Sequence, residues 1–397
     1  MAGCACYASR VSAGVKRILI VSASIGSGHV AAGRALERAF GEAGFATEHI
    51  DLLAYTAAPF RRLYRQAYFD LVQHVPDLVE WLGRRMDRAP REDKTAQQRL
   101  RARLSRLLSY ELPRHIARAH PDVVVHTHFL GPEILSGRTR RRPVATPQVE
   151  VITDFFAHSL WLQPGLLRYY VATEEVAVHL RSAKVAGERI RVTGIPIDGR
   201  YATLPGRAEA RAELGLNVER DVLLLMAAGL QPAVLRALVA QLRELSWPLD
   251  AVVVCGRSPE LVSVATGAVE GYDGPVTFQV HGQREDVPLL MAAADMLAGK
   301  PGGLTTSEAL AAGLPIAVIT PYPLQEEANA NALLELGTAL RIEPLSTFTH
   351  KLRSFLADPE RRAAMAAAAR RAGRPHAARD IAVSVADELL GAGPPPA

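Results

Sequence analysis

The sequence predicts an α/β protein with two doubly wound, Rossmann-like domains whose parallel sheets face each other across a central cleft. Short apolar runs alternate with longer amphipathic stretches along most of the chain, which is typical of βαβ units. The runs are continuously apolar, as expected for strands that helices cover on both faces. The chain has 397 residues, more than one domain of ~100–200 residues usually contains.

A first series of strands occupies the N-terminal half. Arg17–Ser22 (RILIVS) begins it, and the helix Ala31–Ala43 follows, with Leu36 and Phe40 on one face. The further expected strands are Thr47–Leu52, Asp122–His126, Val149–Thr153, Tyr169–Ala172 and Ile190–Thr193.

A second series begins near Arg220. Its expected strands are Val222–Met226, Ala251–Cys255, Val276–Val280, Met296–Ala298 and Ile316–Ile319, and its helices are Val234–Leu245, Glu285–Ala293 and Ser307–Ala312. The Pro- and Gly-containing segment Gly194–Gly215 separates the two series and is interpreted as the linker. The predicted division is a tail 1–14, a domain 15–195, a domain 196–373, and a C-terminal helix with a Pro-rich tail, 374–397.

The composition excludes several classes of protein. Hydrophobic residues make up 49% and charged residues 22%, which is globular rather than disordered. Three cysteines without a CxxC pair argue against a disulfide framework and a structural metal, and favour a reducing compartment. The sequence has neither an apolar window of about 18 residues nor a signal-peptide core, so a cytoplasmic location is expected. The net charge is +5, but no nucleic-acid-binding signature accompanies it.

Residues 56–118 are more basic than the rest of the chain. They hold fourteen Lys and Arg against seven Asp and Glu, and aromatic residues lie between the arginines. Such a stretch can lie on an anionic membrane surface. The alternative is a helical insertion with a solvated arginine face.

The first glycine-rich loop follows Arg17–Ser22 and contains Gly26, Ser27, Gly28 and His29. Small residues let the backbone approach a ligand, and the next helix points its N-terminus towards it. Gly26 to Ala31 also fits a relaxed GxGxxA fingerprint, with Asp51 some 20 residues on, so a nicotinamide-dependent dehydrogenase is an alternative.

His29 is placed at the first turn of the helix that follows this loop, at the mouth of the cleft. The positive end of the helix dipole disfavours imidazolium there. A neutral imidazole at this point could take a proton from a substrate hydroxyl. The alternative is a histidine that caps the helix or packs against it.

The second glycine-rich loop follows the short strand Met296–Ala298 and opens a helix. Its glycines expose backbone N–H groups, three hydroxyl side chains add donors, and an acidic residue in the first turn could accept from a ribose diol. This is more than a helix cap needs, so a nucleotide diphosphate site is predicted. The residues are Gly302, Gly303, Thr305, Thr306, Ser307 and Glu308.

A third polar segment follows Ile316–Ile319. Gln325, Glu326 and Asn329 lie where a turn leads into a helix, and such groups can donate to and accept from sugar hydroxyls. The alternative is an ordinary polar helix start.

These motifs together resemble the monogalactosyldiacylglycerol-synthase and processive diacylglycerol-glucosyltransferase family. This is a GT-B branch related to the lipid II-forming N-acetylglucosaminyltransferase. The resemblance lies in SIGSGH (24–29), KPGGLTTSEAL (300–310) and LQEEANA (324–330). Further matches, in order along the chain, are TDFFAHSLW (153–161), VTGIPI (192–197), VVVCGRSPEL (252–261) and GQREDVPLLMAAADMLAGKPGG (282–303).

The resemblance implies a GT-B transferase that moves a hexose from a UDP-sugar to a lipid, with diacylglycerol as the expected acceptor. His29 would be the catalytic base of an inverting transfer. Gly302 and Gly303 would face the diphosphate, Glu308 the ribose, and Gln325 and Glu326 the hexose. The segment 56–118 would dock on the acceptor and on an anionic membrane, which places the enzyme on the inner face. The sequence contains no DxD triplet, so no metal or other cofactor is expected.

The chain departs from the family pattern at two places. Leu324 stands where the family has Gly, and Ala227–Gln231 replaces a glycine-rich loop. Other interpretations therefore stay open: a GT-B transferase with another acceptor such as a polyprenyl-linked glycan, a UDP-sugar epimerase, or a regulator that binds a UDP-sugar without transferring it.

Overall fold

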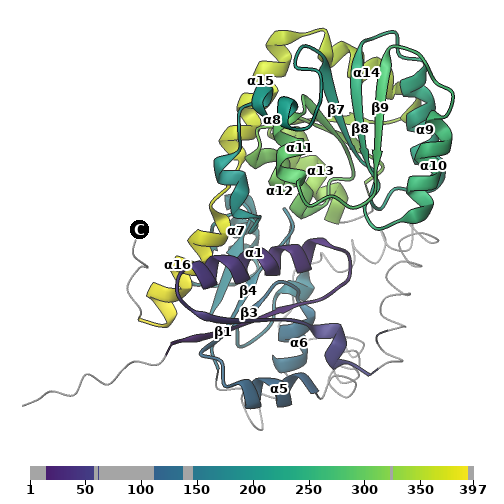
Figure 1. Cartoon of the computed structure of the whole chain (residues 1–397). Coiled ribbons are helices and arrows are strands. Elements are labelled where there is room, and N and C mark those ends of the chain that lie inside the picture. Colours follow the sequence, from purple (N-terminus) through teal and green to yellow (C-terminus); the bar gives the residue numbers. More distant parts are fainter. Residues whose placement is uncertain (1–14, 58–60, 62–110, 137–145, 322–324, 392–397) are drawn as a thin grey trace, which may run out of the picture.

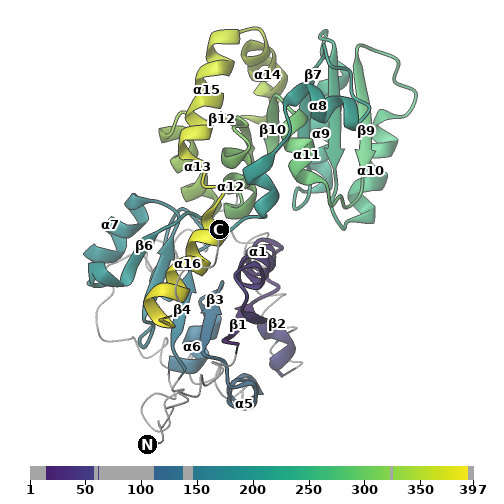
Figure 2. The same ribbon diagram turned by 60° about the vertical axis from the view of Figure 1, so that its left-hand side comes forward.

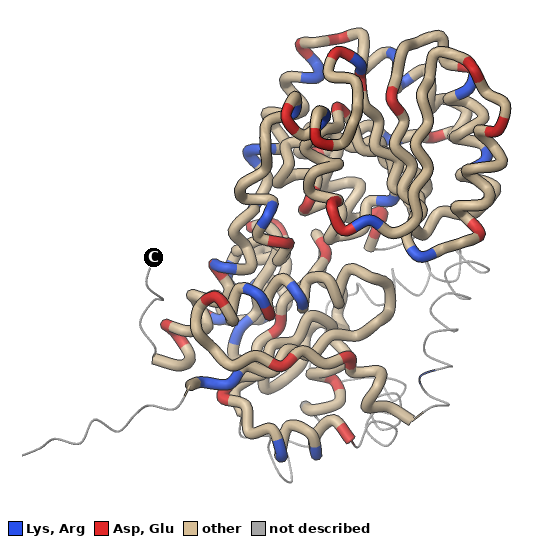
Figure 3. The backbone as a smooth tube through the Cα atoms, viewed as in Figure 1, with Lys and Arg blue, Asp and Glu red and all other residues tan. Residues whose placement is uncertain are grey.

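The computed structural model describes residues 15–57, 61, 111–136, 146–321 and 325–391, which form two α/β domains (Figures 1 and 2). Several predicted features lie outside these ranges: the tail 1–14, residues 392–397 of the C-terminal tail, Leu324, and most of the basic segment 56–118. The predicted basic docking surface therefore stays a prediction. Figure 3 shows acidic and basic residues interspersed over both domains.

The N-terminal domain is built on a six-stranded parallel sheet in the order β2-β1-β3-β4-β5-β6. Its strands are β1 (Arg17–Ser22), β2 (Ala46–Asp51), β3 (Val123–His126), β4 (Gln148–Val151), β5 (Arg168–Val171) and β6 (Ile190–Val192). Its helices are α1 (Gly28–Glu42), α5 (Glu111–Ala119), α6 (Leu130–Ser136) and α7 (Glu174–Ser182), with 3-10 turns η1 (Leu52–Tyr55), η2 (Ser159–Trp161) and η3 (Gly187–Arg189).

The C-terminal domain repeats this architecture in the order β12-β11-β10-β7-β8-β9. Its strands are β7 (Asp221–Met226), β8 (Leu249–Val254), β9 (Val276–His281), β10 (Met296–Gly299), β11 (Ile316–Ile319) and β12 (Ala339–Ile342). Its helices are α8 (Arg207–Glu213), α9 (Pro232–Arg243), α10 (Pro259–Val269), α11 (Val287–Ala293), α12 (Gly303–Ala311), α13 (Gln325–Glu335), α14 (Phe348–Leu356) and α15 (Pro359–Ala372), with turns η4 (Gly199–Thr203) and η5 (Leu345–Thr347).

The predicted fold class is confirmed, and each predicted strand overlaps an observed one. The sequence analysis missed β12, because this short edge strand carries Arg341 and has no continuous apolar run. The predicted linker Gly194–Gly215 contains the 3-10 turn η4 and helix α8. Helix α12 begins at Gly303, four residues before the predicted start at Ser307.

The last helix, α16 (Ala377–Leu389), returns from the C-terminal domain and packs on the N-terminal sheet, as Figures 1 and 2 show in yellow. Ile381 and Val385 join the apolar cluster formed by β1, β3 and α1. Tyr170 Oη and Ser384 Oγ lie 3.0 Å apart, and Arg191 forms a bidentate pair with Glu388. Burial of apolar surface against α1 therefore ties the end of the chain to the first domain.

Each sheet has one topological switch point, where the strand order reverses. It lies between β1 and β3 in the N-terminal sheet and between β7 and β10 in the C-terminal sheet. Ligands of open parallel sheets bind at the carboxyl ends of the strands that flank such a switch point. Both predicted glycine-rich loops lie there, because one follows β1 and the other follows β10. The topology therefore predicts that the site lies where these two loops meet.

Candidate functional site

His29 is the second residue of α1 and is held by two groups from neighbouring strands. Its Nδ1 lies 2.9 Å from the carbonyl oxygen of Thr127 and 2.8 Å from Thr153 Oγ1. A carbonyl oxygen can only accept a hydrogen bond, so Nδ1 must carry the proton. The neutral ring then has its lone pair on Nε2, which is the tautomer that a general base needs.

Burial lowers the pKa of His29 to about 4, and the Thr127 carbonyl offsets only part of this effect. The imidazole is therefore neutral near pH 7. The Thr127 hydroxyl lies 2.9 Å from both the His29 carbonyl oxygen and Ser22 Oγ, and Ser22 Oγ lies 2.7 Å from His49 Nε2. This polar network holds the backbone of His29 as well as its ring.

Aromatic side chains flank His29 on one side. The His128 ring lies 4.7 Å from the His29 ring in an edge-on arrangement, and Phe129 stacks on His128 at 4.1 Å. Trp161 is fully buried, and its ring centroid lies 6.3 Å from that of His29. The sequence analysis gave none of these residues a role, although Trp161 ends the motif at 153–161. They form a largely buried aromatic cluster next to His29.

The two predicted glycine-rich loops meet. A Cβ on Gly28 would lie 3.7 Å from Leu304, and one on Gly303 would lie 2.0 Å from the carbonyl oxygen of Thr153. Gly303 is therefore required by close contact with the other domain. Around Gly302, the residue that precedes α12, a Cβ would meet nothing within 4 Å.

The three predicted hydroxyl donors are placed differently from one another. Thr305 is partly exposed, whereas Thr306 is fully buried and its hydroxyl has no partner among the described residues. The Ser307 hydroxyl donates to the carbonyl oxygen of Gly303 at 2.9 Å. Ser307 also lines a pocket of about 520 Å³ between the domains, next to Phe155. Its hydroxyl is thus already used within the helix.

Glu308 lies close to the linker. Burial and, to a smaller extent, the charge of Asp198 raise its pKa to about 8, although Arg200 acts in the opposite direction. Arg200 and Asp198 form an ion pair at 3.0 Å. A carboxyl in this setting can either donate to or accept from a ligand hydroxyl. The roles of Asp198 and Arg200 were not foreseen, because they belong to a segment interpreted only as a linker.

Lys300 was part of the predicted loop but was not singled out. It is nearly buried between the ends of β7 and β10: its Nζ lies 3.8 Å from Glu326 Oε2, and its Cδ would lie 3.8 Å from a Cβ on Gly229. Burial lowers its pKa to about 8, while Glu326 raises it. This places a cation at the switch point, where phosphate groups bind in such folds.

Gln325 and Glu326 open α13 and are partly exposed, whereas Asn329 is fully buried. The Asn329 carboxamide accepts from the backbone N–H of Phe155 at 2.8 Å, and it donates to Pro301 O at 2.9 Å and to Asp154 Oδ1 at 3.3 Å. Asn329 therefore connects the two domains. Its contact with a sugar stays a prediction.

The first loop lacks the free acid that a dinucleotide site would use. Asp51 Oδ1 accepts from the backbone N–H groups of Ser24 and Leu53, both at 3.1 Å. Gly26 has φ +79°, a conformation that favours glycine, and Gly26 and Ser27 are exposed. Asp51 Oδ1 is thus used to shape the turn. Across the described ranges, no group of three or more His, Cys, Asp or Glu side chains is placed to hold a metal ion.

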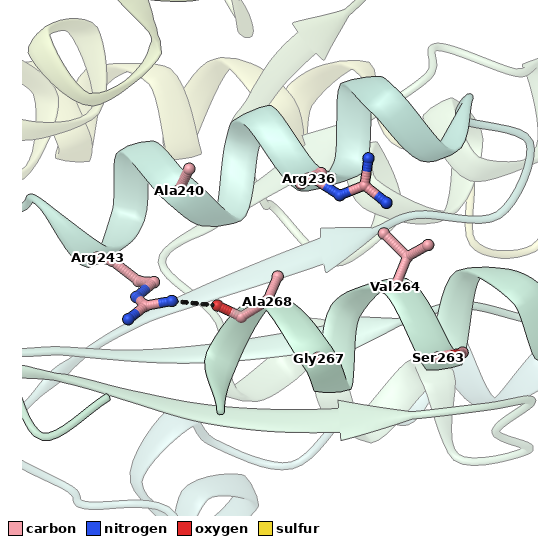
Figure 4. Close-up of a pocket in the computed structure, with 7 residues that line it drawn as sticks. All are labelled: Arg236, Ala240, Arg243, Ser263, Val264, Gly267 and Ala268. Atoms are coloured by element: carbon pink, nitrogen blue, oxygen red, sulfur yellow. Dashed lines mark hydrogen bonds between the residues drawn. The ribbon is translucent and has the colours of Figure 1, made fainter. Parts of the chain in front are cut away.

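A second hollow, of about 430 Å³, lies between α9 and α10 and includes Arg236 and Arg243 (Figure 4). Arg243 donates to the carbonyl oxygen of Ala268 at 2.7 Å. This hollow lies between two helices of the C-terminal domain and includes none of the predicted site residues.

Among the residues described, no helix is both long and apolar enough to cross a membrane.

Comparisons with known proteins agree with this arrangement. Residues 29–197 match the family model described as monogalactosyldiacylglycerol (MGDG) synthase, and residues 209–372 match the model described as glycosyl transferases group 1. The chain is 27% identical over 357 residues to the processive diacylglycerol beta-glucosyltransferase of Bacillus subtilis, covering 87% of this chain and 88% of that one. It is also 27% identical over 401 residues to the protein of the same name from Bacillus thuringiensis, covering 94% of both.

Solved structures share the fold. MurG of Acinetobacter baumannii superposes with a TM-score of 0.60 at 17% identity, covering 95% of this chain and 99% of that one. The MnaA–UDP co-structure from S. aureus gives a TM-score of 0.63 at 15% identity, covering 96% and 99%. The two-domain GT-B architecture is therefore shown.

Proposed function

We propose that this chain, a GT-B glycosyltransferase that joins a monogalactosyldiacylglycerol-synthase domain to a group 1 glycosyl transferase domain, moves a hexose from a UDP-hexose to diacylglycerol. The names of its relatives supply the acceptor class. The observation that carries the chemistry is His29, whose Nδ1–H is committed to the Thr127 carbonyl while the loop that opens α12 lies against its neighbour Thr153.

The proposed reaction is a single displacement. His29 Nε2 takes the proton of the acceptor hydroxyl while that oxygen attacks the anomeric carbon of the hexose. The bond from the anomeric carbon to the diphosphate oxygen breaks, UDP leaves with the electron pair, and the anomeric configuration inverts. The Thr127 carbonyl stabilises the imidazolium that forms, because it holds Nδ1–H throughout.

The donor is expected to lie on the C-terminal domain. The N-terminus of α12 at Gly302 and Gly303 and the ammonium of Lys300 favour the negative charge of the departing UDP. Glu308 is expected at the ribose, and Gln325 with Glu326 at the hexose. We expect the cationic groups to take the place of a divalent metal, so a chelator should leave the rate unchanged.

The acceptor is expected on the aromatic side of His29. Phe129, which stacks on His128 and is the partly exposed ring of this cluster, would offer apolar surface to an acceptor with apolar chains. We expect the enzyme to act as a peripheral protein on the inner, cytoplasmic face of an anionic membrane. The basic segment 56–118 would supply the docking surface.

The direct test is transfer from radiolabelled UDP-glucose and UDP-galactose to diacylglycerol in anionic liposomes, with and without a chelator, followed by lipid extraction. Label in the organic phase with a β-linked product supports the proposal. Recovery of the label only as free hexose, or as an epimerised UDP-sugar, would contradict the proposal that diacylglycerol is the acceptor. If the protein binds UDP-hexose but no assay shows turnover, the result would favour the alternative of a regulator that binds a UDP-sugar without transferring it.

Replacement of the base gives the largest expected effect. His29→Ala should lower kcat about 10²–10⁴-fold, the usual contribution of a general base, with UDP affinity by calorimetry nearly unchanged. The matched control is His350→Ala, since His350 is exposed on α14 of the other domain. Full activity in His29→Ala would show that another group is the base.

A further inference from the structure

Three consecutive residues after β4, Thr153–Phe155, touch both domains beside His29, and we call them the closure segment. The Thr153 hydroxyl lies 2.8 Å from His29 Nδ1. The carbonyl oxygen of the same residue faces Gly303, where a Cβ would approach to 2.0 Å. Thr153 therefore contacts the proposed base of one domain and the donor-side loop of the other.

The next two residues of the closure segment extend the contact to α13. The Phe155 N–H donates to Asn329 Oδ1 at 2.8 Å, and Asn329 Nδ2 donates to Asp154 Oδ1 at 3.3 Å. The Phe155 ring packs against the apolar core of the C-terminal domain. Both polar contacts cross the domain boundary, so they exist only while the domains are closed.

Asn329 is fixed on its own side as well. Its Nδ2 also donates to the carbonyl oxygen of Pro301 at 2.9 Å, and the residue is fully buried. Pro301 immediately precedes the glycines of the α12 loop. The amide therefore connects the closure segment to the loop at which we place the diphosphate, and its two N–H groups are both occupied.

We propose that the closure segment and Asn329 hold His29 in its catalytic orientation only when the donor domain has closed. In this view Asp154 and Asn329 are positioning residues and not ligands of the sugar. On opening, the closure segment loses its contacts with Gly303 and Asn329, so Thr153 is no longer restrained from the other domain and Thr127 remains the fixed partner of the imidazole. Coupling the base to closure would protect the UDP-hexose from attack by water before the acceptor is in place. The inference rests on the proposed role of His29.

A double-mutant cycle tests the coupling. Asn329→Ala and Asp154→Ala should each lower kcat about tenfold, with the KM for UDP-hexose and the affinity for UDP within about threefold of wild type. The double variant should be no slower than Asn329→Ala, because both substitutions break one shared contact. A raised KM for UDP-hexose in Asn329→Ala with unchanged kcat would make Asn329 a sugar ligand and overturn the inference. Multiplicative losses would overturn the coupling.

Two neighbouring glycines provide a matched pair. Gly303→Ala places a methyl group against the Thr153 carbonyl and should keep the domains apart, which solution scattering with UDP present would record as a larger radius of gyration. Gly302→Ala has open space around it and should leave the scattering curve unchanged, whatever it does to UDP affinity. Identical scattering of Gly303→Ala and wild type would overturn the role of closure. Thermal unfolding of each variant shows whether it is folded.

The failures of the two proposals are distinguishable. If His29→Ala keeps full activity, the proposed base is wrong, whatever the closure segment does. If His29→Ala is inactive while Asn329→Ala retains the wild-type kcat, only the closure role is overturned.

Thr153→Val provides an independent readout, since it removes one hydrogen bond to the base and should lower kcat by about 2–10-fold without changing UDP affinity.

Discussion

The two domains share a six-stranded parallel sheet but bury different groups in it. Strands β3 and β4 of the N-terminal sheet carry His126, Gln148 and Glu150, all buried. In the C-terminal sheet, β10 and β11 contain only apolar residues and glycine, and its polar site residues lie in the loops. Two neighbouring strands of the N-terminal sheet thus carry buried polar side chains, whereas the corresponding strands of the C-terminal sheet are aliphatic.

Buried acids show the same contrast. In the C-terminal domain Asp250 pairs with Arg220 at 3.1 Å, and Asp295 pairs with Arg211 at 2.6 Å. In the N-terminal domain Glu150 is fully buried, and neither of its carboxylate oxygens has a partner among the described residues. Burial raises the pKa of Glu150 well above its usual value. Removing the acid of a buried ion pair leaves its arginine unpaired, whereas removing an acid without a partner leaves no such charge, so the two sheets should respond in opposite ways to similar substitutions.

The largest effect in this comparison is expected at Lys300, the buried cation of the donor side. Lys300→Met keeps the length of the side chain and removes the charge, and it should lower kcat/KM about 10–100-fold, as expected when one charged hydrogen bond is lost. Arg236→Met, in the remote hollow of Figure 4, removes a charge from the same domain and should leave kcat/KM unchanged. Equal effects in the two variants would mean that net charge, and not the position of Lys300, decides the rate.

Glu308 provides a pH dependence of donor affinity. Its pKa of about 8 means that the carboxyl is mostly protonated at pH 7. The ionised carboxylate is the better acceptor for hydrogen bonds that the ribose hydroxyls donate. The affinity for UDP-glucose should therefore rise between about pH 7 and pH 9, through the pKa, and then level off. Glu308→Gln should lower that affinity about tenfold above pH 8 and abolish the dependence. An unchanged affinity by calorimetry would exclude the ribose contact.

The two kinds of buried acid can be compared by stability. Unfolded Glu150 ionises above about pH 4.5, whereas the folded form keeps its proton, so the raised pKa lowers stability as the pH rises. Glu150→Gln should then stabilise the protein at pH 7 by about 1–2 kcal/mol, and Asp250→Asn should destabilise it by a similar amount. Urea titration of both variants measures the difference, and a loss of stability in Glu150→Gln would imply a partner that the described residues do not show.

The smallest expected effect concerns acid sensitivity. Burial lowers the pKa of His126 to about 4, and its bond to Gln148 offsets only part of this. Between about pH 6.5 and pH 4 the unfolded chain binds a proton that the folded chain does not, so stability falls as the pH falls. At pH 5.5 this should amount to about 1 kcal/mol, and His126→Asn should reduce it in acid denaturation curves. The same slope in both proteins would assign the acid loss to other groups.

Sequence reasoning reached the parts of the site that depend on local chemistry. The glycine-rich turns after β1 and β10, and His29 at the start of α1, follow from residue types at short spacing. The partners of His29 could not be predicted, because Thr153 is 124 positions away and meets it only through the order of the strands. The pairing of Phe155 with Asn329, across 174 positions, also requires the packing of the two domains.

The amino-acid sequence by itself determined eleven of the twelve described strands, the two glycine-rich loops and the type of chemistry available there, since hydrophobic periodicity and turn residues act over a few positions. Three features depend on the tertiary structure alone: the nitrogen of His29 that carries the proton, the lack of room for a side chain at Gly303, and the packing of α16 on the N-terminal sheet. These properties depend on hydrogen bonds and close contacts between groups that are distant in the chain, and only the packed fold brings such groups together.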